Sequence, residues 1–131
     1  MTLGLADTSV VIDFNDPELR SHLPDESSVS TITLAELASG THIASDPAER
    51  AERQMRLQQT EGLFEVLNFD RACAQSYGQI VGATLAAGRS HRRRAIDLLI
   101  AAVAHANGLA LYTRNPNDFV GLEDLISVVA V

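Results

Sequence analysis

Short apolar runs alternate along this chain with longer segments in which apolar residues recur every three or four positions. The short runs are rich in leucine, valine and isoleucine and have the length of buried strands. The longer segments have the spacing of amphipathic helices. The short runs predict strands over residues 3–6, 28–32, 63–67, 109–113 and 126–129.

The segments between these strands predict helices over residues 9–14, 33–44, 95–107 and from 70 to near 88. A further, mostly polar helix begins at Pro47, because Asp46 can cap it and Glu49 can complete a capping box. The 95–107 helix is apolar nearly all round, so we expect it to be largely buried.

Alternating strands and helices predict an α/β fold with a five-stranded, mostly parallel sheet flanked by helices. The length of 131 residues suits one domain, and we assign residues 1–131 to it. In sheets of this kind, ligands bind beyond the carboxyl ends of the strands. Chemistry is therefore expected at that edge.

Four acidic residues lie beside or within apolar stretches. Asp7 follows the first predicted strand, Glu36 lies just past the second, and Asp118 follows the fourth. Asp97 interrupts the apolar 95–107 helix. A charge among apolar residues is costly unless it is paired, hydrogen-bonded or bound to a cation. The joint placement of the four acids predicts a shared site for a divalent metal ion.

Two of these acids have simple structural alternatives within a helix. Asp7 could cap the helix that follows it, although Thr8 or Ser9 could cap that helix and leave Asp7 free. Glu36 could be an exposed residue on an amphipathic helix, where glutamate is common. We favour the role of metal ligand for Asp7, because a second capping residue is at hand.

The other two acids have alternatives as well. Asp97 could form a structural ion pair, since Arg93 and Arg94 lie one turn upstream. Asp118 could be a turn or capping residue in the segment that begins at Asn115. Each acid is a weak indication by itself, and the metal site rests on their joint placement.

Composition places the chain among ordinary globular proteins. It is 46% hydrophobic and 21% charged, and Cys73 is its only cysteine, so no intrachain disulfide can form. The sequence shows no basic leader and no apolar run of membrane-spanning length. We therefore expect a cytoplasmic protein that does not enter a membrane.

The charge of the chain bears on its partners. A net charge of −7 argues against general affinity for nucleic acid. However, all ten basic residues are arginines, and four of them lie between residues 89 and 94. Arginine binds phosphate through planar, bidentate contacts. The absence of lysine excludes a P-loop and disfavours phosphoaspartate enzymes and response-regulator receivers, which use a lysine beside the aspartate.

The order of these motifs resembles that of PIN-domain ribonucleases, and most closely the VapC toxins of bacterial toxin–antitoxin pairs. The resemblance spans nearly the whole chain. Its most specific parts are the block around Asp97 and the block Thr113-Arg114-Asn115 through Asp118-Phe119, while Asp7-Thr8-Ser9 alone is weak.

The resemblance implies a five-stranded parallel sheet and an endoribonuclease that inhibits translation, with tRNA or rRNA as the expected substrate. It implies Mg²⁺ or Mn²⁺ held by carboxylates, a homodimer, and neutralisation by a VapB-type antitoxin. The residues that it implies are the metal ligands and catalytic residues Asp7, Glu36, Asp97 and Asp118, with Ser9, Thr113 and Asn115 as supporting residues. The arginines themselves, through their affinity for phosphate, make Arg92, Arg93 and Arg114 the expected RNA contacts.

Two features depart from the family pattern. Many relatives carry an acid directly after Thr-Arg, where this chain has Asn115, so the fourth ligand is either weakened or supplied by Asp118. The stretch from Ser90 to Arg94 is more basic than in many relatives, which indicates a distinct RNA preference.

The expected control by an antitoxin has an electrostatic basis. Four carboxylates without metal attract cations, so a partner peptide could insert an arginine among them. An amphipathic helix of the partner could dock on the helices between residues 33 and 60. Two other functional classes stay open at this point: a catalytically silent PIN-like binding domain, and a metal-dependent phosphatase, DNA nuclease or housekeeping nuclease that uses the same acids.

Overall fold

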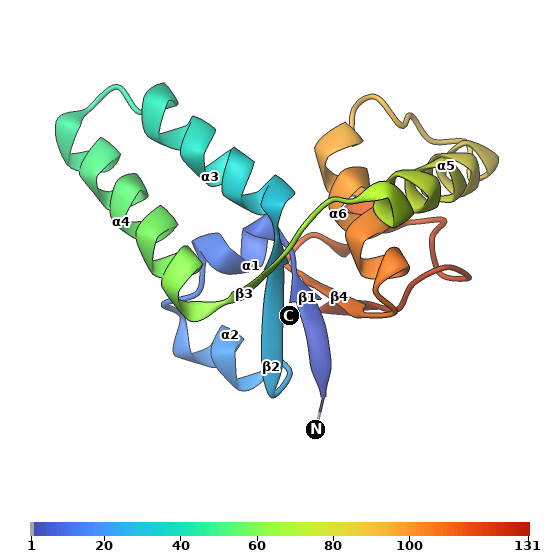
Figure 1. Ribbon diagram of the computed structural model, residues 1–131, viewed down its shortest axis with the longest axis horizontal. Helices are drawn as coiled ribbons and strands as arrows, with labels where there is room; N and C mark the ends of the chain where they lie inside the picture. The colour runs from blue at the N-terminus through green and yellow to red at the C-terminus, as the bar shows by residue number, and fades with distance from the viewer. Residues whose placement is uncertain (1) are drawn as a thin grey trace.

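Residues 2–131 of the computed structural model contain a five-stranded sheet in which every strand pairs in parallel with its neighbour (Figure 1). The strand order is β3-β2-β1-β4-β5. This arrangement confirms the predicted α/β class and its parallel sheet. The strands are β1 (Leu3–Ala6), β2 (Glu26–Ser30), β3 (Glu65–Leu67), β4 (Ala110–Thr113) and β5 (Val128–Ala130).

The helices form two arms above the sheet. Figure 1 shows α3 and α4 as one arm and α5 and α6 as the other, with a gap between them, and the two helices of each arm pack together. No helix within residues 2–131 is long and apolar enough to cross a bilayer. The helices are α1 (Thr8–Ile12), α2 (Pro17–Ser21), α3 (Thr31–Ile43), α4 (Pro47–Leu63), α5 (Arg71–Ala86), α6 (Ala95–Ala106) and the short 3-10 helix η1 (Pro116–Phe119).

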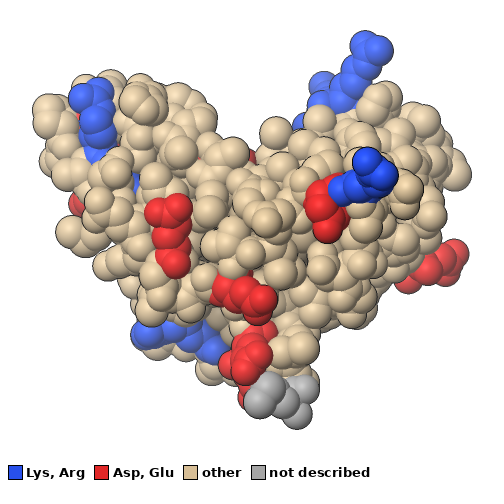
Figure 2. Space-filling model, in the orientation of Figure 1, with Lys and Arg blue, Asp and Glu red and all other residues tan. Residues whose placement is uncertain are grey.

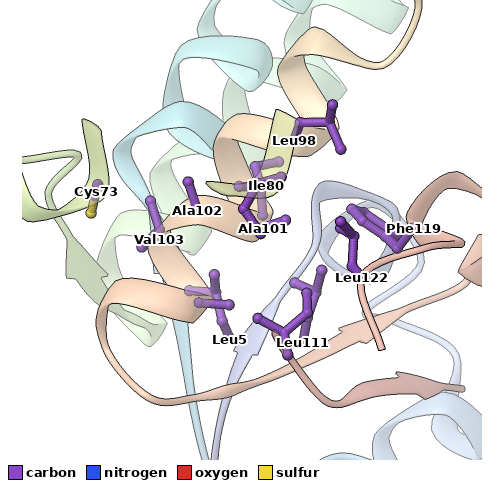
Figure 3. Close-up of a cluster of buried hydrophobic side chains, with 13 residues drawn as sticks. Leu5, Cys73, Ile80, Leu98, Ala101, Ala102, Val103, Leu111, Phe119 and Leu122 are labelled. Carbon is purple, nitrogen blue, oxygen red and sulfur yellow. The ribbon is translucent and has the colours of Figure 1, made fainter. Parts of the chain in front are cut away.

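Apolar side chains pack on both faces of the sheet, because successive residues of a strand point to opposite sides. Leu5 belongs to the larger cluster, which the buried faces of α5 and α6 complete (Figure 3). The next residue of β1, Ala6, belongs to a second cluster with Val10, Val29 and Leu37. Helix α6 is buried over most of its length, as predicted from its apolar sequence.

Several predicted boundaries are wrong by two residues, and one helix was missed. Strand β2 ends at Ser30, because Ser30 caps α3 by accepting a hydrogen bond from the Thr33 backbone N–H at 3.1 Å. The β-branched residues Thr31 and Ile32 favoured a strand, but they form the first turn of that helix. The missed helix is α2, which Asp16 caps ahead of Pro17.

The two edge strands also differ from the prediction. Helix α4 continues to Leu63, so β3 starts at residue 65 and not at 63. Strand β5 covers residues 128–130, because Ile126 is still in the preceding turn, where its N–H bonds the Leu122 carbonyl. Leu63 and Ile126 are apolar and match a strand pattern, but tertiary packing places them outside the strands, and the local sequence does not show that packing.

Candidate active site

The four predicted acids come from four separate elements and gather at the carboxyl edge of the sheet. Asp7 directly follows β1, Glu36 lies in the second turn of α3, Asp97 in the first turn of α6, and Asp118 in η1. They are close enough that the negative charges of the other three all raise the pKa of Asp97. Figure 2 shows the molecule hollowed between the two arms, above this edge of the sheet.

Asp7 is buried and is the most firmly held of the four, since three donors bond its carboxylate. Its Oδ1 accepts the Thr8 backbone N–H at 2.9 Å. Its Oδ2 accepts the hydroxyls of Ser9 at 3.0 Å and Thr113 at 2.8 Å. Asp7 is therefore the N-cap of α1, and the expectation that Thr8 or Ser9 would replace it as the cap is wrong. The Asp7 side chain thus caps α1 and also belongs to the group of four acids.

Ser9 and Thr113 connect Asp7 to the end of β4. The hydroxyl of Ser9 accepts the Arg114 backbone N–H at 3.1 Å, and that of Thr113 accepts the Asn115 backbone N–H at 2.9 Å. The segment after β4 is thus tied to the segment after β1. The Asn115 side chain is exposed and makes no hydrogen bond within residues 2–131.

Glu36 is held by a residue that the sequence interpretation considered only as a helix cap. The Thr8 hydroxyl donates to Glu36 Oε1 at 2.6 Å and lies 2.9 Å from the hydroxyl of Thr33. Thr8 stands between Asp7 and Ser9 in the first motif, and Thr33 lies one turn before Glu36. The helical spacing of Thr33 and Glu36 was visible in the sequence, but the approach of α1 to α3 was not.

Burial and mutual repulsion set the electrostatics of the site. Burial is the main cause that raises the pKa of Asp97 to about 6, followed by the charges of Asp7, Asp118 and Glu36. Burial also raises the pKa of Asp7, although its three hydrogen bonds oppose the shift. The pKa of Glu36 is raised by burial, and the hydrogen bond from Thr8 opposes this. The site therefore disfavours its own negative charge.

No arginine forms an ion pair with these acids within the described part of the chain. The ion pairs there are Glu49–Arg53, Asp13–Arg114 and Asp16–Arg114. The alternative of a structural ion pair between Asp97 and Arg93 or Arg94 is therefore wrong. Arg94 donates to the Ser90 carbonyl at 3.3 Å, and its charge lowers the pKa of Asp97 less than burial and the three acids raise it.

The donor set suits a hard divalent ion, because it consists of carboxylate and hydroxyl oxygens. No three histidine, cysteine, aspartate or glutamate side chains among residues 2–131 lie together in a group that could hold a metal ion. Mg²⁺ does not need a closed cage, because it keeps several waters and usually binds through one or two carboxylates. The carboxylates therefore suit a hard divalent ion that keeps part of its water shell.

The arginines predicted to contact RNA have different surroundings. Arg92 and Arg93 are exposed on the loop before α6. Arg114 is held by Asp13, with 3.2 Å from Nε to Oδ2, and by Asp16, with 3.6 Å from Nη2 to Oδ2. The Nε and Nη2 groups of Arg114 are therefore already paired with carboxylates.

A groove of about 710 Å³ separates α1 from α4. Its walls carry exposed apolar side chains, among them Ile12, Met55 and Leu63. The groove includes only the later part of the 33–60 segment that was predicted to dock a partner helix. The lining residues are Val11, Ile12, Phe14, Asn15, Arg20, Glu52, Met55, Arg56, Gln59, Thr60, Leu63 and Phe64.

Several known proteins resemble this chain in sequence and fold. The PIN domain family model matches residues 5–122. Ribonuclease VapC4 of Mycobacterium tuberculosis is 36% identical over 126 residues, which cover 93% of this chain and 92% of VapC4. The plasmid stability protein StbB of Pseudomonas syringae pv. tomato is 31% identical over 128 residues, or 88% of this chain and 89% of StbB.

A solved structure extends the likeness to three dimensions. The crystal structure of VapBC-5 from Mycobacterium tuberculosis, a member of the VapBC family of toxin–antitoxin systems, contains a chain that superposes with a TM-score of 0.86. The sequence identity is 30%, and the superposition covers 100% of both chains.

Proposed function

The chain belongs to the PIN-domain family, among its VapC-type ribonucleases, and from this premise we propose that it is the toxin of a toxin–antitoxin pair. It cleaves RNA internally in the cytoplasm with Mg²⁺ or Mn²⁺ and thereby inhibits translation. The observation that carries this proposal is the convergence of Asp7, Glu36, Asp97 and Asp118, none of which forms an ion pair within the described residues.

These four carboxylates would hold the metal ion. When bound, a divalent ion supplies Lewis acidity for hydrolysis of a phosphodiester. Asp118 suits the fourth position better than Asn115, because its charge raises the pKa values of Asp7 and Asp97 while the Asn115 side chain is exposed. Ser9 and Thr113 keep the Asp7 carboxylate in one orientation.

The exposed arginines would bind the RNA backbone on either side of the cleaved bond. Arg92 and Arg93 lie on the loop that leads into α6, five and four residues before Asp97. This position would bring flanking phosphates toward the acids. Water then adds to the phosphorus, and the bond from phosphorus to the leaving ribose oxygen breaks.

A VapB-type antitoxin would control the site. Solved structures that resemble this chain are toxin–antitoxin complexes, including VapBC-5. The groove between α1 and α4 offers apolar side chains to a partner helix, and the uncompensated acids offer a place for a partner arginine. We also propose a homodimer, as the family resemblance implies.

A purified-protein experiment tests the catalytic proposal. The chain is incubated with structured RNA, DNA and p-nitrophenyl phosphate, each with Mg²⁺, Mn²⁺ or EDTA. Internal cleavage of RNA alone, only with metal, supports the proposal. Cleavage of DNA or of the small ester at a similar rate supports a general nuclease or phosphatase, and no cleavage of any substrate supports a silent binding domain.

Two variants connect the activity to the site. Asp7→Asn and Asp97→Asn should each lower the cleavage rate by about a thousandfold or more, because each is expected to remove a ligand of the metal. Both variants should stay folded. Asp124→Asn is the matched control, because Asp124 is an exposed aspartate outside the site. Wild-type cleavage in both site variants would refute the proposed metal ligands.

A growth experiment tests the toxin role. Expression of the chain alone should slow bacterial growth, and co-expression of the small neighbouring open reading frame should restore it. Harmless expression of an active, folded enzyme would favour a housekeeping nuclease.

A further inference from the structure

Three buried hydroxyl groups form a line that ends at Glu36. Ser30, at the end of β2, lies 3.5 Å from the hydroxyl of Thr33 in the first turn of α3. The Thr33 hydroxyl lies 2.9 Å from that of Thr8 in α1, and Thr8 bonds Glu36 Oε1 at 2.6 Å. Ser30 and Thr33 are 0% exposed and Thr8 is 9% exposed.

An ionised Glu36 fixes the direction of these hydrogen bonds. A hydroxyl has one proton to donate, and a carboxylate can only accept. Thr8 must therefore donate to Glu36, so its oxygen accepts from Thr33. Thr33 has then used its proton, and its oxygen accepts from Ser30. The Ser30 oxygen in turn accepts the Thr33 backbone N–H at 3.1 Å, so each of the three hydroxyls has a donor and an acceptor role.

Glu36 needs this support more than Asp7 does. Its side chain is longer, has more rotamers, and is only half-buried, and the charge of Asp7 repels it. Thr8 provides the one hydrogen bond that the Glu36 carboxylate accepts within residues 2–131, and it does so through Oε1. The other oxygen, Oε2, has no such partner in that range. The geometry leaves Oε2 available to a cation while Oε1 is held.

We propose that Thr8 is a positioning residue for Glu36, and that Thr33 and Ser30 orient the Thr8 hydroxyl for this purpose. This inference rests on the proposed function, because it takes Glu36 as a ligand of the divalent ion. Thr8 acts through Glu36 and does not itself contact metal or RNA.

The test measures binding of Mn²⁺ alone, at one fixed pH, by calorimetry or by the loss of the free-ion electron paramagnetic resonance signal. Thr8→Val removes the donor and keeps the shape, and we expect Mn²⁺ affinity to fall about tenfold, since a hydrogen bond to a charged group is lost. Thr8→Ser keeps the hydroxyl and should restore affinity to within about twofold of wild type. Circular dichroism and thermal unfolding check that each variant is folded.

A double-mutant cycle separates positioning from general loss of structure. Thr8→Val should cost nothing further in a Glu36→Ala background, because the group that it orients is gone. An equal loss in both backgrounds would overturn the inference and assign Thr8 to the fold alone. If Thr8→Val does not fold, Thr8→Ala removes the same donor without the branched side chain and replaces it in the cycle.

The remaining outcomes distinguish this inference from the proposed function. Wild-type protein that binds Mn²⁺ and cleaves RNA, together with a Thr8→Val variant of unchanged affinity, overturns the inference alone. Wild-type protein that binds no Mn²⁺ overturns the proposed function and the inference together.

Discussion

At the scale of single residues, the site contains more negative charge than the protein around it neutralises. Asp97 shows this most clearly, because burial and three neighbouring acids raise its pKa to about 6. The folded protein without metal thus carries an electrostatic cost in this region. A divalent cation would remove that cost, so folding stability and metal binding should be linked.

We expect Asp97→Asn to stabilise the metal-free protein at neutral pH. In the folded protein the pKa of Asp97, about 6, lies above the ordinary aspartate pKa of 3.8, so between these pH values the folded state binds a proton that the unfolded state has lost. The free energy of unfolding therefore falls as pH rises from 3.8 to about 6. Removing the acid should raise it at pH 7 by about 1 kcal/mol, after allowance for solvent screening of this half-exposed carboxylate.

Urea unfolding in EDTA at pH 7 and at about pH 3.5 measures this difference, which should vanish at the lower pH. The exposed Asp124→Asn should show no difference at either pH. Destabilisation of Asp97→Asn at neutral pH without metal would mean that Asp97 has a favourable partner in the fold.

The arginines should differ in how they affect RNA binding. In a cleavage-deficient background, replacing Arg92 and Arg93 by alanine should weaken binding and reduce the salt slope of log K by about one to two. Arg114→Ala should change the slope less, because Asp13 and Asp16 already hold its guanidinium. Fluorescence anisotropy over a series of salt concentrations gives the slopes. Equal slopes for wild type and the double variant would assign Arg92 and Arg93 to a solvated surface.

The sequence identified the acids more readily than the groups that hold them. Asp97 could be found because an acid within an apolar helix needs a partner. Thr8 could not, because a threonine after a strand is common as a cap, and its bond to Glu36 depends on how α1 meets α3. The ion pair expected as an alternative for Asp97 could not be judged from the sequence either. Spacing along the chain puts Arg94 one turn from Asp97, but in the structure Arg94 donates to the Ser90 carbonyl.

At the scale of elements, the position of Asp118 depends on how the segment after η1 packs against α5. Gly121 has φ of +99°, and a Cβ there would lie 2.7 Å from Ala87 Cβ and 3.3 Å from the Ala83 carbonyl oxygen. Only glycine suits both the backbone conformation and this close approach. Sequence patterns predicted α5, but its contact with Gly121, in the segment after η1, joins residues too far apart along the chain for those patterns to predict.

We expect Gly121→Ala to destabilise the protein by about 2–3 kcal/mol, from the strained backbone and the close contact with α5. RNA cleavage should fall as well, because Asp118 lies only three residues before Gly121. Gly82→Ala is the matched control, since Gly82 is exposed within α5 and nothing lies within 4 Å of the added Cβ. That change should be neutral or stabilise by up to about 1 kcal/mol. Thermal unfolding of both variants measures this difference. Equal melting temperatures for Gly121→Ala and Gly82→Ala would contradict the packing argument.

At the scale of the whole molecule, the two arms separate the surfaces that the proposed function needs. The acids lie at the carboxyl edge of the sheet, while the apolar groove lies between α1 and α4. A partner could therefore dock in the groove through apolar contacts and reach the acids with a charged side chain. The hydrophobic pattern predicted the parallel sheet and most of its helices, but not how the helices pair into two arms. It did not predict the groove either, because residues 11–20 and 52–64 that line it are far apart in the sequence.

We expect a charge in the groove to prevent neutralisation by the antitoxin and to leave catalysis intact. Met55 is 58% exposed on α4 and lines the groove. The carboxylate of Met55→Glu should be harmless while it faces solvent, but its burial against an apolar partner helix would cost free energy. Co-expression with the antitoxin should no longer restore growth, and affinity for the antitoxin should fall by about tenfold or more. Leu85→Glu is the matched control, because Leu85 is 53% exposed on α5, away from the groove. RNA cleavage by both purified variants should match wild type, which separates loss of docking from loss of the enzyme. Full neutralisation of Met55→Glu, with cleavage unchanged, would place the antitoxin on another surface.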